Sequence, residues 1–129
     1  MSLLLDTHAL LWWLADDPRL SAPARQAIGD AENSVLVSAA SLWEIATKQR
    51  IGKMPHLTAD FVLRLPDVLA EERMAELAVN ARHAVRAGQH SAAHRDPFDR
   101  MLAAQAEIER LTLVSADKAM AAFGVALLW

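Results

Sequence analysis

The chain begins with three leucines, Leu3-Leu4-Leu5, and this apolar run stops abruptly at Asp6. A short apolar run without polar alternation predicts a strand that is buried on both faces, as strands of parallel sheets usually are. In open α/β folds, ligands bind at the carboxyl edge of such a sheet. Asp6 is therefore expected at the edge where a functional site would form.

Further strands and helices alternate along the rest of the chain. Two expected strands, 34–38 and 111–115, each end in a hydroxyl residue. Two weaker strands are expected at 73–79, at a sheet edge, and at 125–128. The expected helices are 9–15, 21–28, 39–50, 58–69 with a break at Pro66, 80–86, 98–110 and 116–123. Since parallel neighbours need crossover connections, this order predicts an α/β fold, a three-layer α/β/α sandwich with a central, mostly parallel sheet.

Length and composition limit the class of protein. A chain of 129 residues with 53% hydrophobic side chains can bury one core, so residues 1–129 are expected to form a single domain. The absence of cysteine excludes disulfides, zinc–thiolate sites and a cysteine nucleophile. No segment resembles a signal peptide or a membrane span, so a cytoplasmic protein without a membrane partner is expected. The net charge of −3 does not favour nucleic-acid binding, which would need a metal ion or a local basic patch.

Four acidic side chains follow the expected strands or begin the clearest helix, and they are Asp6, Glu44, Asp99 and Asp117. Most of them also have a purely structural explanation. Asp6 can cap a helix, and Asp117 can stabilise a helix dipole. Glu44 can pair with Lys48 or complete a capping box.

The segment Asp96-Pro97-Phe98-Asp99 holds two acids with different prospects. Asp96 precedes a proline, as a helix N-cap commonly does, so the structural role is preferred for it. Asp99 falls at the third helical position, where it can complete the cap or face the site. This choice stays open on spacing alone.

Carboxylates at the ends of parallel strands would share one edge of the sheet. Four of them would repel one another and retain protons unless a cation lay between them. Oxygen ligands without cysteine favour a hard ion such as Mg²⁺ or Mn²⁺. Such an ion can polarise a phosphoryl oxygen and activate a water molecule. Hydrolysis of a phosphodiester is the reaction that suits this chemistry best.

Histidine, basic and tryptophan side chains are weaker candidates. His8 is expected at the polar surface or behind a site acid. His90 and His94 can line the site, although solvated loop positions are preferred for them. Three basic side chains within one turn of a site acid can hold phosphates or balance the acids, namely Arg95, Arg100 and Lys118. The four tryptophans are expected in the core or at a subunit interface.

Four blocks extend over nearly the whole chain: LLLDTHALLW at 3–12, SAASLWEI at 38–45, HRDPFDRML at 94–102 and LTLVSAD at 111–117. In order and spacing they resemble the PIN-domain ribonucleases, specifically the VapC-type toxins of bacterial type II toxin–antitoxin systems. The resemblance implies a PIN-like fold and a Mg²⁺- or Mn²⁺-dependent endoribonuclease that hydrolyses RNA. It also implies a cognate antitoxin that blocks the site, and frequent homodimers.

The same resemblance assigns the catalytic and metal-binding acids of the family, motif by motif, to Asp6, Glu44, Asp99 and Asp117. Asp99 is preferred over Asp96 because the family's acid precedes a small pair, here Ala103-Ala104, by four residues. Asp6 and Asp99 are then the main metal ligands, and the other two acids bind a second ion or orient water. Hydrogen bonds are expected to hold the acids in place, from Ser115 and from Thr7 or Ser38.

Two other functions fit part of the pattern. A receiver-like phosphoacceptor domain has a similar size, but it would need an acid pair after the first strand and an acid on an inner strand. The first strand offers only Asp6, and the second ends in Ser38. A non-catalytic protein-binding module of the same fold would use the acids only as helix caps, so removing one of them would leave Mn²⁺ binding unchanged.

Overall fold

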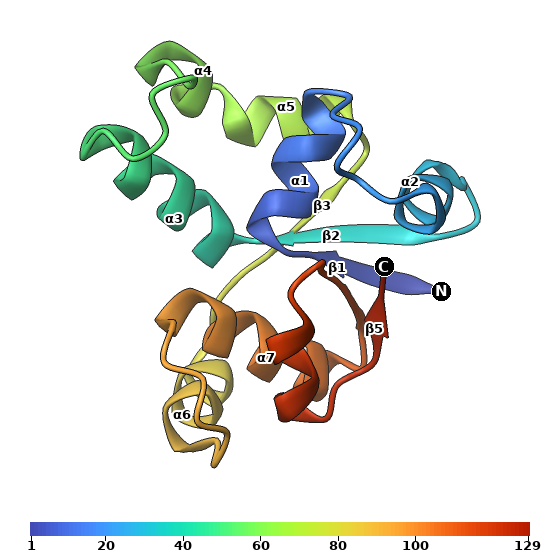
Figure 1. The fold of residues 1–129 in the computed structure, drawn as a ribbon, viewed down its shortest axis with the longest axis vertical. Helices are drawn as coiled ribbons and strands as arrows, with labels where there is room; N and C mark the ends of the chain where they lie inside the picture. The colour runs from blue at the N-terminus through green and yellow to red at the C-terminus, as the bar shows by residue number, and fades with distance from the viewer.

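The computed structural model describes all 129 residues and has one five-stranded parallel sheet in the order β3-β2-β1-β4-β5 (Figure 1). The strands are β1 (Ser2–Leu5), β2 (Ser34–Ser38), β3 (Ala75–Leu77), β4 (Thr112–Val114) and β5 (Leu127–Leu128). The helices are α1 (Thr7–Leu14), α2 (Ala22–Gly29), α3 (Ala39–Arg50), α4 (Ala59–Leu63), α5 (Leu65–Glu71), α6 (Ala81–Gln89), α7 (Pro97–Glu109) and the 3-10 helix η1 (Lys118–Phe123).

Strand β1 lies in the middle of the sheet, hydrogen-bonded to β2 on one side and to β4 on the other. Leu3, Leu4 and Leu5 are each 0% exposed. Leu3 and Leu5 belong to one hydrophobic cluster and Leu4 to a second, because successive side chains of a strand point to opposite faces. The predicted strand that is buried on both faces is therefore confirmed.

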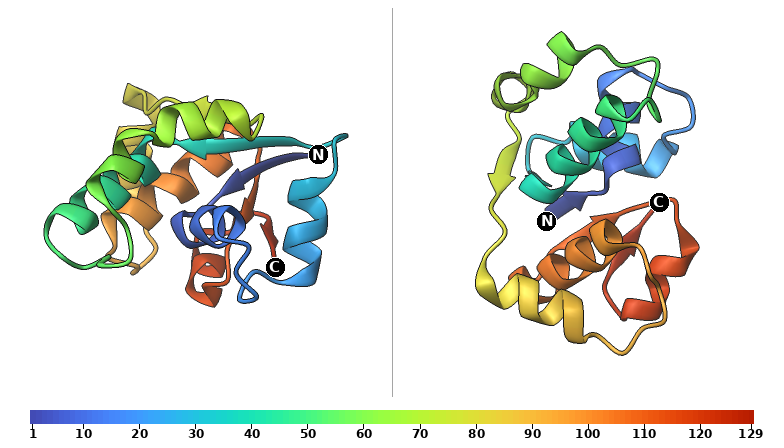
Figure 2. Two further views of the ribbon diagram at one scale, coloured as in Figure 1. Left: turned by 90° about the horizontal axis from the view of Figure 1, so that it is seen from above. Right: turned by 90° about the vertical axis from the view of Figure 1, so that its left-hand side faces the viewer.

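The helices form a layer on each face of the sheet, as the two views of Figure 2 show. Helices α1, α2, α3 and α5 supply the cluster that contains Leu3 and Leu5, and α4 packs at its margin. Helices α7 and η1 supply the cluster that contains Leu4, and α6 packs on α7. The predicted α/β/α sandwich is thus confirmed. None of the helices has both the length and the apolar composition needed to cross a membrane.

The strand order reverses between β1 and β4. The chain first runs outward from β1 through β2 to β3, then returns and adds β4 and β5 on the other side of β1. Right-handed crossovers place the connecting helices of these two halves on opposite faces. Ligands of such sheets bind outside the carboxyl ends of the strands at the point of reversal. Receiver domains have the order 2-1-3-4-5, so the receiver alternative is excluded by the topology.

Most helix and strand boundaries agree with those predicted from the sequence. Thr58 caps α4, and Pro66 lies in the first turn of α5, so the predicted break is present. The weak strand at 73–79 is real but short and lies at the sheet edge, and the last predicted helix is a 3-10 helix that begins at Lys118. Trp43 is not a core residue, because its side chain is 68% exposed while the next residues, Glu44 and Ile45, face inward.

Truncating Leu4 should destabilise the protein strongly. Leu4→Ala removes a side chain that is 0% exposed in the central strand, so the free energy of unfolding should fall by about 2–5 kcal/mol. Leu63→Ala is the matched control, because Leu63 is 79% exposed and its loss should change the free energy by less than about 0.5 kcal/mol. Urea unfolding followed by circular dichroism measures both, and equal effects would contradict the assigned core.

Candidate functional site

Asp6 lies where β1 ends and α1 begins, beside the end of β4. Its backbone N–H donates to the carbonyl of Val114 (3.0 Å), which ties it to that strand. Its Oδ1 accepts from the N–H of Ala9 (2.8 Å), so Asp6 is the N-cap of α1. The side chain is nevertheless at the sheet edge where the strand order reverses. Asp6 therefore has the predicted structural role and a place at the candidate site.

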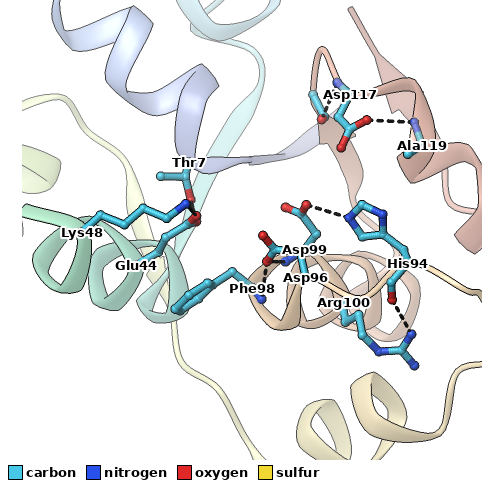
Figure 3. A network of polar contacts seen from close by, with 11 residues as sticks. Thr7, Glu44, Lys48, His94, Asp96, Phe98, Asp99, Arg100, Asp117 and Ala119 are labelled. Carbon is cyan, nitrogen blue, oxygen red and sulfur yellow. Dashed lines mark hydrogen bonds and ion pairs between the residues drawn. The ribbon is translucent and has the colours of Figure 1, made fainter. Parts of the chain in front are cut away.

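The two acids at the start of α7 divide the roles between them. Asp96 Oδ1 accepts from the backbone N–H groups of Phe98 (2.8 Å) and Asp99 (3.1 Å), so Asp96 is the N-cap. The side chain of Asp99 is free of the cap, and its Oδ2 pairs with Nε2 of His94 at 2.8 Å (Figure 3). Asp96 therefore serves as the helix cap, and Asp99 is left free to pair with His94, whereas the role of Asp99 as the site acid stays a prediction.

Asp117 approaches the site from the end of β4. Its N–H donates to Ser115 Oγ (3.1 Å), and its Oδ1 accepts from Ala119 N–H (2.9 Å), so it caps η1. One ligand atom from each of His94, Asp99 and Asp117 lies within 4.8 Å of the others. Figure 3 shows the carboxylate of Asp117 above that of Asp99.

Glu44 is buried on α3 and stands apart from this cluster. Its Oε1 accepts from the Thr7 hydroxyl (2.5 Å), and its Oε2 accepts from Lys48 Nζ (2.5 Å). The predicted pairing with Lys48 is confirmed. The capping box is wrong, because Ser38 caps α3 by accepting from Ala40 N–H (3.0 Å). Thr7 therefore holds an acid as expected, whereas Ser38 serves the helix instead.

The acids interact electrostatically although their carboxylates are not hydrogen-bonded to one another. Burial raises the pKa of Asp6, hydrogen bonds from Ser115 and Ala9 act in the opposite direction, and the charge of Asp99 raises the pKa further. Burial also raises the pKa of Asp99, where His94 opposes the effect and the charges of Asp96 and Glu44 add to it. The folded chain thus holds carboxylates in a place that disfavours their ionised form.

Arg100 organises the loop that precedes α7, a role that the sequence did not indicate. Its guanidinium donates to five backbone carbonyls, those of Ala87, Gly88, His90, Ala92 and His94. These bonds use the donors of the Arg100 guanidinium. Arg100 therefore has neither of its two predicted roles, which were to bind a phosphate or to balance the charge of the acids. Held in this way, the loop presents His94 to Asp99.

His94 does not have the solvated loop position that its sequence context predicts. Its ring is partly buried, pairs with Asp99 and packs edge-on against Phe123 at a centroid distance of 5.7 Å. The only sequence signal was its position two residues before the Asp96 cap. His8, by contrast, is exposed and stacks on Trp12, in agreement with the surface position expected for it.

The donor set fits a divalent cation. Asp99, Asp117 and His94 offer two carboxylates and an imidazole within one small volume. Asp6 is not a member of this close group, but it lies near enough for the charge of Asp99 to raise the pKa of Asp6. A cation would relieve the cost of ionising buried carboxylates, and oxygen-rich sets of this kind suit Mg²⁺ or Mn²⁺. The catalytic and metal-binding roles of Asp6, Glu44, Asp99 and Asp117 remain predictions.

Comparisons with known proteins agree with this fold. A family model of the PIN domain matches residues 3–125. Over 42 residues the chain is 52% identical to Ribonuclease VapC16 of Mycobacterium tuberculosis (strain ATCC 25618 / H37Rv), a match that spans 30% of the chain and only 30% of that relative.

Solved structures resemble the whole chain. VapBC-1 from nontypeable Haemophilus influenzae superposes with a TM-score of 0.71 at 16% identity, covering 99% of this chain and 97% of that one. VapC20 of Mycobacterium tuberculosis, described as a Sarcin-Ricin loop cleaving toxin, gives a TM-score of 0.70 at 15% identity and covers 96% of each chain. At these identities the likeness shows the fold alone.

Asp6→Asn should stabilise the metal-free protein at neutral pH. The pKa of Asp6 is raised in the folded chain above its ordinary value of 3.8, so ionisation of this carboxyl works against folding. Asparagine stays uncharged and can still cap α1. The advantage of the variant should shrink as the pH falls through the raised pKa and should vanish below the ordinary value of 3.8, where Asp6 is protonated in both the folded and the unfolded parent. Urea unfolding in EDTA over a pH series measures this, and a parent that is more stable at neutral pH would contradict it.

Proposed function

Because this chain belongs to the PIN domain family, we propose that it is a Mg²⁺- or Mn²⁺-dependent endoribonuclease and the toxin of a toxin–antitoxin pair. The observation that carries the proposal is the convergence of Asp99, Asp117 and His94 beside Asp6, at the point where the strand order reverses. Residues 1–129 act as one domain in this proposal. RNA is the substrate, and the cytoplasm is the place of action.

The acids of this chain would hold the metal ion and orient the reacting groups. Asp6 and Asp99 are the main ligands, Asp117 completes the set from the end of β4, and Glu44 orients water from its position beside Thr7. When bound, the ion supplies polarisation of a phosphoryl oxygen and activation of water. The hydroxyl of Ser115 hydrogen-bonds the carboxylate of Asp6 and accepts from the backbone N–H of Asp117. One hydroxyl therefore helps to hold two of the acids in place.

Arg95 and Lys118 are the basic side chains that remain for the RNA backbone. Both are exposed, and each is next to a residue of the site, Arg95 to His94 and Lys118 to Asp117. The guanidinium of Arg100 donates to backbone carbonyls and is therefore not available to bind a phosphate. Phosphate contacts of this kind position a nucleic acid without reading its sequence, so this pair would bring the scissile phosphate to the acids.

The purified protein should cleave RNA when Mg²⁺ or Mn²⁺ is present. Cleavage should stop in EDTA and return when the metal is restored. Asp6→Asn and Asp99→Asn should each reduce the rate by at least ~100-fold, since each removes a charge from the cation site. Gel analysis of a labelled RNA measures the rate.

Asp67→Asn is the matched control, because Asp67 is an exposed acid in the first turn of α5 that belongs neither to the group of candidate metal ligands nor to the charges acting on Asp6 and Asp99, so this variant should keep full activity. Cleavage that continues without metal, or that survives Asp6→Asn, would contradict the proposed function. Unchanged Mn²⁺ binding by Asp99→Asn would favour the non-catalytic alternative.

A cognate antitoxin is the proposed protein partner, as the resemblance to VapC-type toxins implies. A groove of about 550 Å³ between α1 and the segment before α4 is a suitable surface for it. Its lining includes the apolar side chains of Leu11, Trp12 and Phe61, and also Lys53 and His8, which add polar and basic character. A homodimer is also proposed, and the exposed indole of Trp43, packed edge-on against Phe98 at 5.2 Å, is an apolar surface available for it.

Induced expression in a bacterial host should arrest growth, and Asp99→Asn should abolish the arrest. Co-expression of the proposed cognate antitoxin should restore growth. Lys53→Glu should keep RNA cleavage by the purified protein but weaken binding of that antitoxin, which native gel shift measures. Equal arrest by the parent and by Asp99→Asn would contradict the toxin role.

A further inference from the structure

We propose that His94 is itself a ligand of the metal ion and that it gives the site a preference for Mn²⁺ over Mg²⁺. This inference rests on the proposed function, because it concerns the same ion. It goes beyond that function, since the four acids alone define an all-oxygen site with no reason to discriminate against Mg²⁺.

The spacing of the donor atoms fits one coordination sphere. Nε2 of His94 lies 2.8 Å from Oδ2 of Asp99, and the ligand atoms of both lie within 4.8 Å of one on Asp117. Two ligands that are each about 2.1 Å from an ion stand about 3 Å apart when adjacent and about 4.2 Å apart when opposite. For an ion to bind, the proton shared between Nε2 of His94 and Oδ2 of Asp99 would have to leave to solvent or move to Nδ1, which frees the Nε2 lone pair. The imidazole and the two carboxylates would then need only small side-chain movements to share the ion.

The backbone of His94 is already held in place. Arg100 donates to the carbonyl of His94 (2.8 Å), and also to those of His90 (2.6 Å) and Ala92 (2.9 Å). The His94 ring rests against Phe123. Because Arg100 follows Asp99 directly on α7, the same helical turn carries one ligand and positions the other. Little conformational entropy remains to be lost when an ion binds.

The other well-placed histidines have both ring nitrogens in use. Nδ1 of His90 accepts from Ala92 N–H (3.0 Å), so its Nε2 donates to the carbonyl of Phe123 (3.2 Å). Nδ1 of His83 accepts from Asn80 N–H (3.1 Å), and its Nε2 contacts a glutamate on α7 at 3.0 Å. Of these three histidines, only His94 directs a ring nitrogen at a site acid, which makes His90 a matched control from the same loop.

An imidazole ligand changes which ion is preferred. Mg²⁺ is bound through oxygen and keeps several of its waters, so a nitrogen donor in its shell adds little. Among first-row divalent ions Mn²⁺ gains least from an imidazole, but it accepts a nitrogen ligand more readily than Mg²⁺ does. A site in which His94 joins Asp6, Asp99 and Asp117 should therefore bind Mn²⁺ more tightly than Mg²⁺, and losing His94 should remove most of the difference.

Pulsed electron paramagnetic resonance of the Mn²⁺ complex tests the proposal directly. With the histidines labelled with ¹⁵N, the bound ion should show hyperfine coupling to a directly coordinated nitrogen in the parent protein and in His90→Ala. The coupling should vanish in His94→Ala. In calorimetric titrations the Mn²⁺ dissociation constant of His94→Ala should rise at least ~10-fold, and the Mg²⁺ constant should change by less than ~3-fold.

Two results would overturn the proposal, and they differ in what they say about the proposed function. Mn²⁺ bound by the parent protein without nitrogen coupling would show that His94 only orients Asp99, and the endoribonuclease proposal would stand. Absence of any Mn²⁺ binding by the parent protein would overturn both. The decisive spectrum is that of the parent protein, so the test does not depend on the stability of a variant.

Discussion

The position of β1 between β2 and β4 is the constraint on which the site depends. Its three leucines are buried against helices on both faces, so the strand cannot slip without exposing a hydrophobic cluster. The strand order reverses beside it, and the acids that follow β1 and β4 reach the same edge. The hydrophobic core therefore determines where Asp6 and Asp117 lie, although neither belongs to it.

Electrostatic strain at this edge is what links the fold to its chemistry. Burial and neighbouring charges raise the pKa of both Asp6 and Asp99, while the chain supplies only partial compensation through Ser115 and His94. Glu44 is treated differently, because Thr7 and Lys48 occupy its two oxygens. A divalent cation would stabilise the ionised forms of Asp6 and Asp99, whose compensation is only partial. Glu44, whose two oxygens already have partners, is better suited to orienting a neighbouring group.

The features that were predictable from the sequence are those with local signals. Apolar runs indicate β1, β2 and β4. A serine cap with a nearby proline indicates α2, and an aspartate cap before a proline indicates α7. These signals were enough to predict the layers of the fold and the sheet edge at which the site lies. The contacts of Arg100 and His94 were not predictable, because they join a loop to α7 and η1 and leave no periodic pattern. The exposed position of Trp43 was not predictable either, because the contacts of its neighbours on α3 determine which face of that helix is buried. The roles of the four acids still rest on resemblance and convergence.

If the acids at the point of strand reversal form a divalent-metal site, anomalous diffraction from crystals grown with Mn²⁺ should reveal the ion there, because this method locates the ion without assumptions about activity. We expect one strong peak within coordination distance of Asp6, Asp99 and Asp117, with Asp96 still capping α7. A Mn²⁺ peak elsewhere on the surface, or none at this edge, would contradict it.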